Sequence, residues 1–148
     1  MVINSLKDLE SFAASLVSKI KIGDCILLSG PIGSGKTTFS RFFINALQAK
    51  NNLPKTIVQS PTFNILYEYK IKDKNIMHYD FYRLKKLQEI NNLDFEENIE
   101  NCITLIEWPE LLEKNKIHNR LEINFNPSKM NNSRKIKISA KGRLRGKI

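Results

Sequence analysis

The sequence has only two cysteines, Cys25 and Cys102, and each lies within an apolar run that resembles a β-strand. Two isolated cysteines in such runs do not provide the ligand spacing of a zinc site. They also do not suggest the disulfide framework that small secreted domains use. We therefore expect both thiols to be reduced and buried, as in a cytoplasmic protein.

Long hydrophobic runs are also missing. No apolar stretch approaches the roughly 20 residues that span a bilayer, and the first residues lack the pattern of a signal peptide. Hydrophobic residues make up 41% of the chain and charged residues 26%, which is ordinary for a globular protein. Its 148 residues suffice for one domain with a substantial core. We expect a single cytoplasmic domain over residues 1–148 that does not contact a membrane and that acts with partners.

Acidic residues are few relative to basic ones, and the 24 lysines and arginines give a net charge of +9. This excess suits an anionic partner such as RNA, although a merely lysine-rich, solvated surface explains it equally well. Residues 141–147 contain four cations and two glycines. We expect residues 141–148 to form a flexible basic tail that is either simply solvated or contacts RNA or an acidic protein surface.

The sequence does contain a phosphate-binding loop, because residues 30–37 match G-x-x-x-x-G-K-[ST] at every fixed position. Gly33 and Gly35 have no Cβ, so the backbone can adopt left-handed angles and turn its N–H groups toward an anion. Lys36 adds a positive charge at the β- and γ-phosphates, and the Thr37 hydroxyl is placed to ligate Mg²⁺. A glycine turn with an incidental lysine is the alternative.

The flanks of this loop favour the phosphate-binding interpretation. Residues 24–28 form a short apolar run that is typical of a buried parallel strand. A helix is predicted after the loop by apolar residues at helical spacing: Phe39, Phe42, Phe43, Ala46 and Leu47. The N-terminus of that helix would direct its dipole and free N–H groups at the phosphates. The sequence therefore predicts a nucleoside triphosphate site.

The rest of the chain alternates between helical and strand periods. These patterns predict a helix over residues 6–20 and short helices within 84–100. They also predict strands at 56–58, 64–70, 76–79, 102–107, 119–125 and 134–140, and a turn at 131–133. This order favours a three-layer α/β fold like that of P-loop NTPases. Its sheet would be mainly parallel with antiparallel additions, and helices would cover both faces.

Two carboxylates end predicted strands, where α/β sheets place their catalytic groups. Asp80 could hold Mg²⁺, orient the attacking water, or form an ion pair with Arg83 at a helix start. Glu107 ends the apolar run 102–107. The second sequence element of phosphate-loop proteins also has an acid at the end of a strand, and that acid holds Mg²⁺ directly or through water. A purely structural role for Glu107 is the alternative.

Three other side chains each allow two interpretations. Thr62 lies in the loop 59–63, where it could reach the γ-phosphate and its metal as a switch residue does, or only satisfy its own turn. Trp108 is the only tryptophan, and it suits a packing anchor as well as a lid. His78 lies within an apolar strand, where we expect a structural hydrogen bond rather than a ligand.

Four motifs stand in a fixed order: residues 30–38 with Arg41, the Ser-Pro-Thr-Phe run at 60–63, His-Tyr-Asp-Phe-Tyr-Arg-Leu at 78–84, and Ile-Glu-Trp-Pro-Glu at 106–110. Together they resemble the TsaE (YjeE) family, the small ATPase of bacterial tRNA threonylcarbamoyladenosine synthesis. The phosphate loop alone is generic, but the other three motifs together are specific. The resemblance extends over residues 6–142.

The resemblance implies a function beyond what spacing shows. The family binds and hydrolyses ATP with Mg²⁺ and works with the TsaB–TsaD pair, which transfers the threonylcarbamoyl group to the adenosine beside the tRNA anticodon. The ATPase does not perform that transfer itself. We therefore expect a hydrolase that supports TsaB and TsaD and that meets tRNA through their complex or through its basic tail.

The resemblance also implies roles for individual residues. Matched by motif, Gly33, Ser34, Gly35, Lys36, Thr37 and Thr38 hold phosphates, Thr37 and Glu107 bind Mg²⁺, Thr62 is the switch-like threonine, Asp80 is needed for hydrolysis, Trp108 flanks the site, and Arg134 lies near the nucleotide. The sequence departs from the family at Pro31 and Ile32, where an acidic residue is frequent, and in its basic tail. The first departure leaves the phosphate loop intact, and the second affects only additional contacts.

Two other functions remain open at this point. A small-molecule phosphotransferase on the same fold would need an acceptor pocket and a lid with arginines, for which the chain leaves little room. A nucleotide-dependent RNA-binding module would use the basic tail. A GTPase is disfavoured because no N-K-x-D motif is present.

Overall fold

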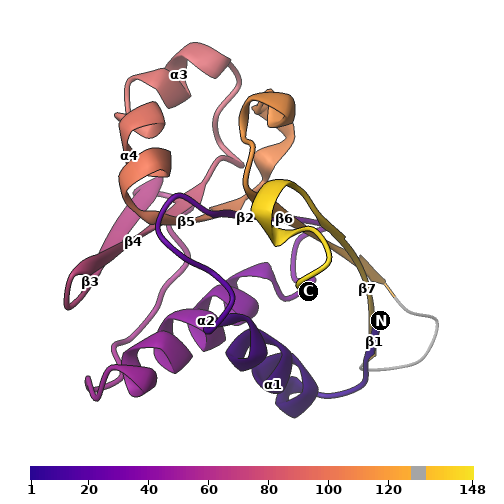
Figure 1. Cartoon of the computed structure of the whole chain (residues 1–148). Helices are drawn as coiled ribbons and strands as arrows, with labels where there is room; N and C mark the ends of the chain where they lie inside the picture. The colour runs from indigo at the N-terminus through magenta and orange to yellow at the C-terminus, as the bar shows by residue number, and fades with distance from the viewer. Residues whose placement is uncertain (128–132) are drawn as a thin grey trace.

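A seven-stranded mixed sheet forms the middle of the molecule (Figure 1). The computed structural model describes residues 1–127 and 133–148. The strands are β1 Val2–Ile3, β2 Cys25–Ser29, β3 Leu66–Ile71, β4 Lys74–Asp80, β5 Ile103–Glu107, β6 Arg120–Pro127 and β7 Arg134–Ala140. Their spatial order is β1-β7-β6-β2-β5-β4-β3.

The four central strands β6, β2, β5 and β4 are parallel, and both edges are antiparallel. Strand β5 is buried along its whole length and β2 over its first four residues, as expected for parallel strands covered on both faces. Strand β6 instead alternates between buried and less buried residues. The predicted mixed sheet and the two predicted hairpins, β3–β4 and β6–β7, are confirmed.

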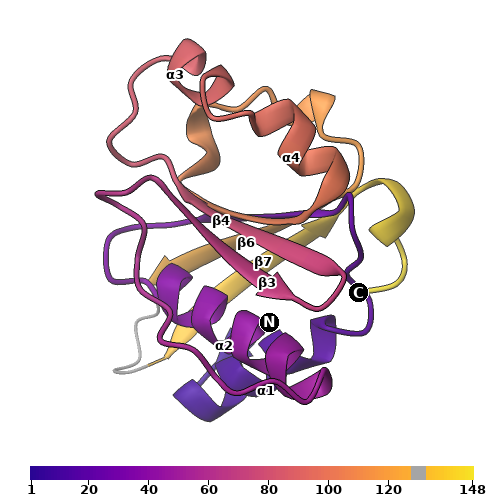
Figure 2. The ribbon, with the colours of Figure 1, turned by 90° about the vertical axis from the view of Figure 1, so that its left-hand side faces the viewer.

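Helices cover both faces of this sheet and produce the predicted three layers (Figures 1 and 2). The helices α1 Leu6–Leu16 and α2 Lys36–Lys50 lie together on one face, and the short helices α3 Leu87–Asn91 and α4 Phe95–Asn101 lie on the other. The described residues also form the short 3₁₀ helices η1 Pro109–Leu111, η2 Lys114–Lys116 and η3 Gly142–Leu144. In the described parts of the chain, no helix combines the length and hydropathy needed to cross a membrane.

Aromatic packing fixes α2 against the sheet. The Phe39 ring lies 5.9 Å from the Phe12 ring of α1 and 6.2 Å from the Phe125 ring of β6, measured between centroids. Phe39 and Phe43 are completely buried. Because Phe39 lies in the first turn of α2, this packing also fixes the helix N-terminus next to the end of β2.

Both cysteines are free and buried, as expected. Burial raises the pKa of the Cys25 thiol to about 12, and a hydrogen bond with Thr104 opposes part of that shift. Cys25 is therefore protonated and unreactive at neutral pH, because the thiolate is the nucleophilic form.

The predicted strand at 56–58 is wrong, because this segment is extended but pairs with no strand. Its polar groups are satisfied by α2 instead: the Gln48 side chain bonds Thr56, and Arg41 Nε donates to the Val58 carbonyl at 3.2 Å. Ile57 is 87% exposed. The predicted helix at 6–20 is shorter, since α1 ends at Leu16, and the two-residue β1 was not predicted. The predicted turn at 131–133 lies mostly outside the described residues.

The C-terminal segment differs from the flexible basic tail expected for residues 141–148. Leu144 is completely buried in the larger core, and η3 carries it there. The Arg143 guanidinium forms an ion pair with the buried carboxylate of Asp24 and also donates to the Lys19 carbonyl at 3.2 Å. A cation and a leucine in a basic stretch thus fasten the segment, so at least one tail cation is not available to an external anion.

Candidate functional site

The phosphate loop connects β2 to α2 through a backbone that only glycine readily adopts. Gly30, Gly33 and Gly35 have φ angles of +132°, +74° and +109°, and Gly35 is the N-cap of α2. A Cβ on Gly30 would lie 2.4 Å from the Phe125 carbonyl oxygen, so a side chain is sterically excluded there. The loop thereby brings the α2 N-terminus, with its partial positive charge, to the end of the sheet.

Lys36 folds back on its own loop. Its Nζ donates to the carbonyl oxygens of Gly30 at 2.7 Å and Pro31 at 2.8 Å, and it lies 4.1 Å from the centre of the Trp108 ring. Burial lowers the pKa of Lys36, while attraction from nearby carboxylates, Glu107 foremost, opposes that shift. A buried cation held by neutral groups is well placed to pair with an anion.

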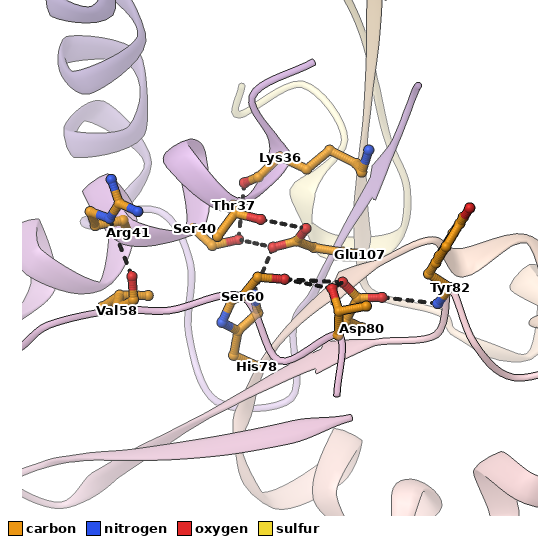
Figure 3. A network of polar contacts seen from close by, with 11 residues as sticks. Lys36, Thr37, Ser40, Arg41, Val58, Ser60, His78, Asp80, Tyr82 and Glu107 are labelled. Atoms are coloured by element: carbon orange, nitrogen blue, oxygen red, sulfur yellow. Dashed lines mark hydrogen bonds and ion pairs between the residues drawn. The ribbon is translucent and has the colours of Figure 1, made fainter. Parts of the chain in front are cut away.

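Glu107, at the end of β5, contacts both α2 and β4 (Figure 3). Its Oε2 accepts a hydrogen bond from Thr37 Oγ1 at 2.9 Å, and its Oε1 lies 2.8 Å from His78 Nε2 and 3.5 Å from Ser40 Oγ. Only 2% of Glu107 is exposed. The structure thus brings together the two residues predicted to bind metal, Thr37 and Glu107. The structural hydrogen bond predicted for His78 is formed, and its partner is Glu107.

Asp80, at the end of β4, anchors the loop 59–63. Its Oδ2 accepts hydrogen bonds from Thr62 Oγ1 at 2.8 Å and Ser60 Oγ at 3.4 Å, and its Oδ1 accepts one from the Tyr82 backbone N–H at 2.9 Å. The alternative ion pair with Arg83 is not formed in the described structure, where Arg83 lies over the Phe63 ring at 5.3 Å. The structure therefore places Thr62 and Asp80 in direct contact.

Sheet register explains why the two acids lie near each other. Asp80 and Glu107 are Cα partners in the parallel β4–β5 ladder, and Leu28 of β2 is the partner of Glu107 on its other side. Because the carboxyl ends of parallel strands meet at one edge, both carboxylates lie next to the loop that leaves β2. The arrangement puts acidic oxygens and a helix N-terminus at one end of the sheet.

A cavity of about 320 Å³ lies at this end of the sheet. Every predicted site residue lines it: Gly33, Ser34, Gly35, Lys36, Thr37, Thr38, Thr62, Asp80, Glu107, Trp108 and Arg134. Its volume is in the usual range for small-molecule sites. The guanidinium of Arg134 covers the loop, since a Cβ on Gly35 would lie 3.2 Å from Arg134 Nε.

Besides Ile32 of the loop itself, sequence reasoning missed two residues that line the cavity, Ser60 and Tyr82. Ser60 contacts both Thr62 and Asp80, and the Tyr82 ring packs 4.8 Å from the Trp108 ring. Ser60 lies inside the motif at 60–63 and Tyr82 inside the motif at 78–84, so their place in these motifs was the signal that could have identified them. Their contacts depend on how the chain folds before β3 and after β4, which the motifs do not specify.

The donor set suits a hard cation that takes only part of its coordination shell from the protein. No group of three or more histidine, cysteine or acidic side chains capable of holding a metal occurs in residues 1–127 and 133–148. Thr37 and Glu107 supply a hydroxyl and a carboxylate within 2.9 Å of each other. Mg²⁺ is commonly bound by one or two protein oxygens, with phosphates and water completing its shell.

Known proteins match this chain over most of its length. A family model described as "Threonylcarbamoyl adenosine biosynthesis protein TsaE" matches residues 3–136. The tRNA threonylcarbamoyladenosine biosynthesis protein TsaE of Rickettsia typhi is 40% identical over 123 residues, which is 83% of each chain. The protein of that name from Aquifex aeolicus is 32% identical over 110 residues, 74% of this chain and 76% of its own.

A solved structure has the same fold. The crystal structure of YdiB from Bacillus subtilis superposes with a TM-score of 0.69 at 26% identity, covering 96% of this chain and 84% of that chain. The family match spans the phosphate loop, Thr62, Asp80, Glu107 and Arg134. All residues that meet at the cavity therefore lie inside the matched region.

Proposed function

The chain belongs to the TsaE family of threonylcarbamoyladenosine biosynthesis proteins, and from that premise we propose that it binds and hydrolyses ATP with Mg²⁺. Hydrolysis would support the TsaB–TsaD pair, which modifies tRNA next to the anticodon. The observation that carries the proposal is the meeting of Thr37 and Glu107 beside the phosphate loop, with Oγ1 and Oε2 2.9 Å apart.

The loop fits a triphosphate in its charge and in its unused donors. Ser34 Oγ is buried and has no hydrogen-bond partner in the described structure. A buried hydroxyl without a partner is costly, and a phosphate oxygen at the loop would satisfy it. Lys36 Nζ would exchange the carbonyls of Gly30 and Pro31 for phosphate oxygens, a stronger charge-assisted contact. Arg134, which lines the cavity, would add a second cation.

Thr37 and Glu107 would hold Mg²⁺, and Glu107 would remain fixed by its contact with β4. The ion would neutralise charge on the β- and γ-phosphates. Asp80 and Thr62 are the candidates for orienting the attacking water, because their carboxylate and hydroxyl meet at 2.8 Å and both line the cavity. Such a reaction requires positioning and electrostatic stabilisation rather than covalent participation of the protein.

Substitutions at Lys36 and Asp80 test the proposal. Lys36→Ala should abolish ATP binding measured by calorimetry, because it removes the cation of the loop. Asp80→Asn should retain binding within about threefold but lower hydrolysis by about 100-fold, the scale of a positioned acid or base. Lys50→Ala is the matched control, since Lys50 is an exposed cation in the last turn of the same helix.

Each result has a contrary outcome. ATP binding by Lys36→Ala as tight as that of the wild type would refute the site. Equal hydrolysis by Asp80→Asn and the wild type would remove Asp80 from the reaction but leave the site in place. Co-purification with TsaB and TsaD, with and without ATP, tests the proposed partners, and failure to associate under both conditions would contradict that part.

A further inference from the structure

His78 is a buried polar residue whose side chain makes its only hydrogen bond in the described structure with Glu107. Its side chain is completely buried, and because side chains alternate along a strand it lies on the face of β4 opposite Met77 and Tyr79. The Nε2 atom lies 2.8 Å from Glu107 Oε1 (Figure 3). On that face, Ile76 and the register partner Leu105 belong to an apolar core, so the contact with Glu107 is the feature to explain.

The contact fixes which ring nitrogen carries a hydrogen. A carboxylate only accepts hydrogen bonds, so Nε2 must donate to Glu107. The second nitrogen, Nδ1, is buried and has no partner in the described structure. A buried polar atom without a partner costs stability. A leucine would fill the same space without that cost, so the imidazole is useful here only through its Nε2–H.

That hydrogen bond determines how the Glu107 carboxylate is turned. Ser40 Oγ is a weak competitor for Oε1, because it lies 3.5 Å away and also donates to the Lys36 carbonyl at 3.2 Å. With Oε1 held by His78, Oε2 is directed at Thr37 and the phosphate loop. One oxygen is therefore tied to the sheet, and the other faces the cavity.

We propose that His78 is a positioning residue that orients Glu107 as a ligand for the nucleotide-bound Mg²⁺; this rests on the function proposed above. His78 does not itself line the cavity, and it acts through the carboxylate. Residues that hold a metal ligand from behind commonly contribute 10- to 100-fold to metal affinity. The same contribution is expected here, with little effect on nucleotide binding in the absence of metal.

Calorimetry with a non-hydrolysable ATP analogue tests this, at varied Mg²⁺ and in EDTA. His78→Leu should raise the Mg²⁺ concentration for half-maximal binding about tenfold or more, while analogue affinity in EDTA stays within about twofold. His78→Gln, which keeps an N–H donor, should recover part of the loss. Tyr79→Phe is the control. Tyr79 follows His78 in β4, and this substitution removes its hydrogen bond with Asn98 of α4.

Several results would overturn the inference. One is a Mg²⁺ dependence of His78→Leu equal to that of the wild type. Another is an equal loss of affinity with and without Mg²⁺, which would indicate general damage to the loop. If the wild-type protein binds no analogue under either condition, the proposed function is wrong, and the inference that rests on it is wrong as well.

A measurement on the wild-type protein keeps the test independent of variant folding. Long-range ¹H–¹⁵N NMR spectra report which imidazole nitrogen is protonated. We expect His78 to carry hydrogen on Nε2, and its signal to shift when Mg²⁺ is added to the analogue complex. An Nδ1-protonated neutral ring, or a signal unchanged by Mg²⁺, would contradict the proposal.

Discussion

Replacing Arg143 with alanine should destabilise the protein by about 2 kcal/mol, because it leaves the Asp24 carboxylate buried without its cationic partner. Asp24 immediately precedes β2, the strand that leads into the phosphate loop. The C-terminal segment thus stabilises the start of the element on which the site depends. A flexible tail would predict almost no effect.

The magnitude follows from how each partner is buried. Removing one member of a fully buried ion pair typically costs about 3–5 kcal/mol. Asp24 is completely buried, but the Arg143 side chain is 27% exposed, so solvent screens part of the interaction. The Lys21 backbone N–H also continues to donate to Asp24 at 2.7 Å. These two features place the expected cost below that range, at about 2 kcal/mol.

Urea unfolding followed by circular dichroism measures this cost, with Arg145→Ala as the control for loss of a cation from the same segment. Arg145 is exposed, so its replacement should change the free energy of unfolding by less than about 0.5 kcal/mol. The slope of free energy against urea should stay the same in both variants. Equal midpoints for Arg143→Ala and Arg145→Ala would refute the reasoning.

Three further predictions concern the core, the loop and alkaline pH. Leu144→Ala should cost about 2–4 kcal/mol in urea unfolding, because Leu144 is completely buried. Gly30→Ala should cost more than about 4 kcal/mol or prevent folding, since its Cβ would meet the Phe125 carbonyl. Gly33→Ala has open space around its Cβ and should cost only about 1–2 kcal/mol of backbone strain. Thermal melts of the two variants compare these costs. Because the pKa of Cys25 is raised from 9.0 to about 12, the unfolded chain ionises first, so stability is complete below about pH 9 and falls as the pH rises. Urea midpoints at increasing pH should therefore decline less steeply in Cys25→Ala.

Each of these has a clear contrary result. A Leu144→Ala protein as stable as the wild type would mean that η3 does not pack on the core. Similar melting temperatures for Gly30→Ala and Gly33→Ala would contradict the close approach of the loop to β6. An alkaline loss of equal slope with and without Cys25 would show that other groups cause it.

The sequence predicted best where the signal was local. The glycines of residues 30–37, the apolar run before them and the helical spacing after them lie within one short stretch, and the structure follows them closely. The hairpins were also predictable, because each pairs neighbouring alternating segments across a short connection.

What failed depended on distant partners. Residues 56–58 have strand-forming side chains, but a strand needs a neighbour, and α2 satisfies their polar groups instead. Leu144 was hidden in a basic stretch whose composition suggested a tail, although a single buried side chain and one ion pair fasten it.

The candidate site shows the same division. The motifs named Thr37, Asp80 and Glu107, but not which groups hold them. That His78 lies against Glu107 follows from the register of β4 and β5, which pairs His78 with Leu105, two residues before Glu107. Because β4 over residues 76–80 and all of β5 are buried, neither strand has the alternating pattern that would specify this register from the sequence.

The most direct test is a crystal structure of the protein with Mg²⁺ and a non-hydrolysable ATP analogue. We expect the triphosphate on the backbone amides of residues 33–37, Lys36 moved from its carbonyls to phosphate, and the metal held by Thr37 with Glu107 beside it, directly or through water. A nucleotide bound elsewhere, or a metal remote from Thr37 and Glu107, would contradict the proposed site.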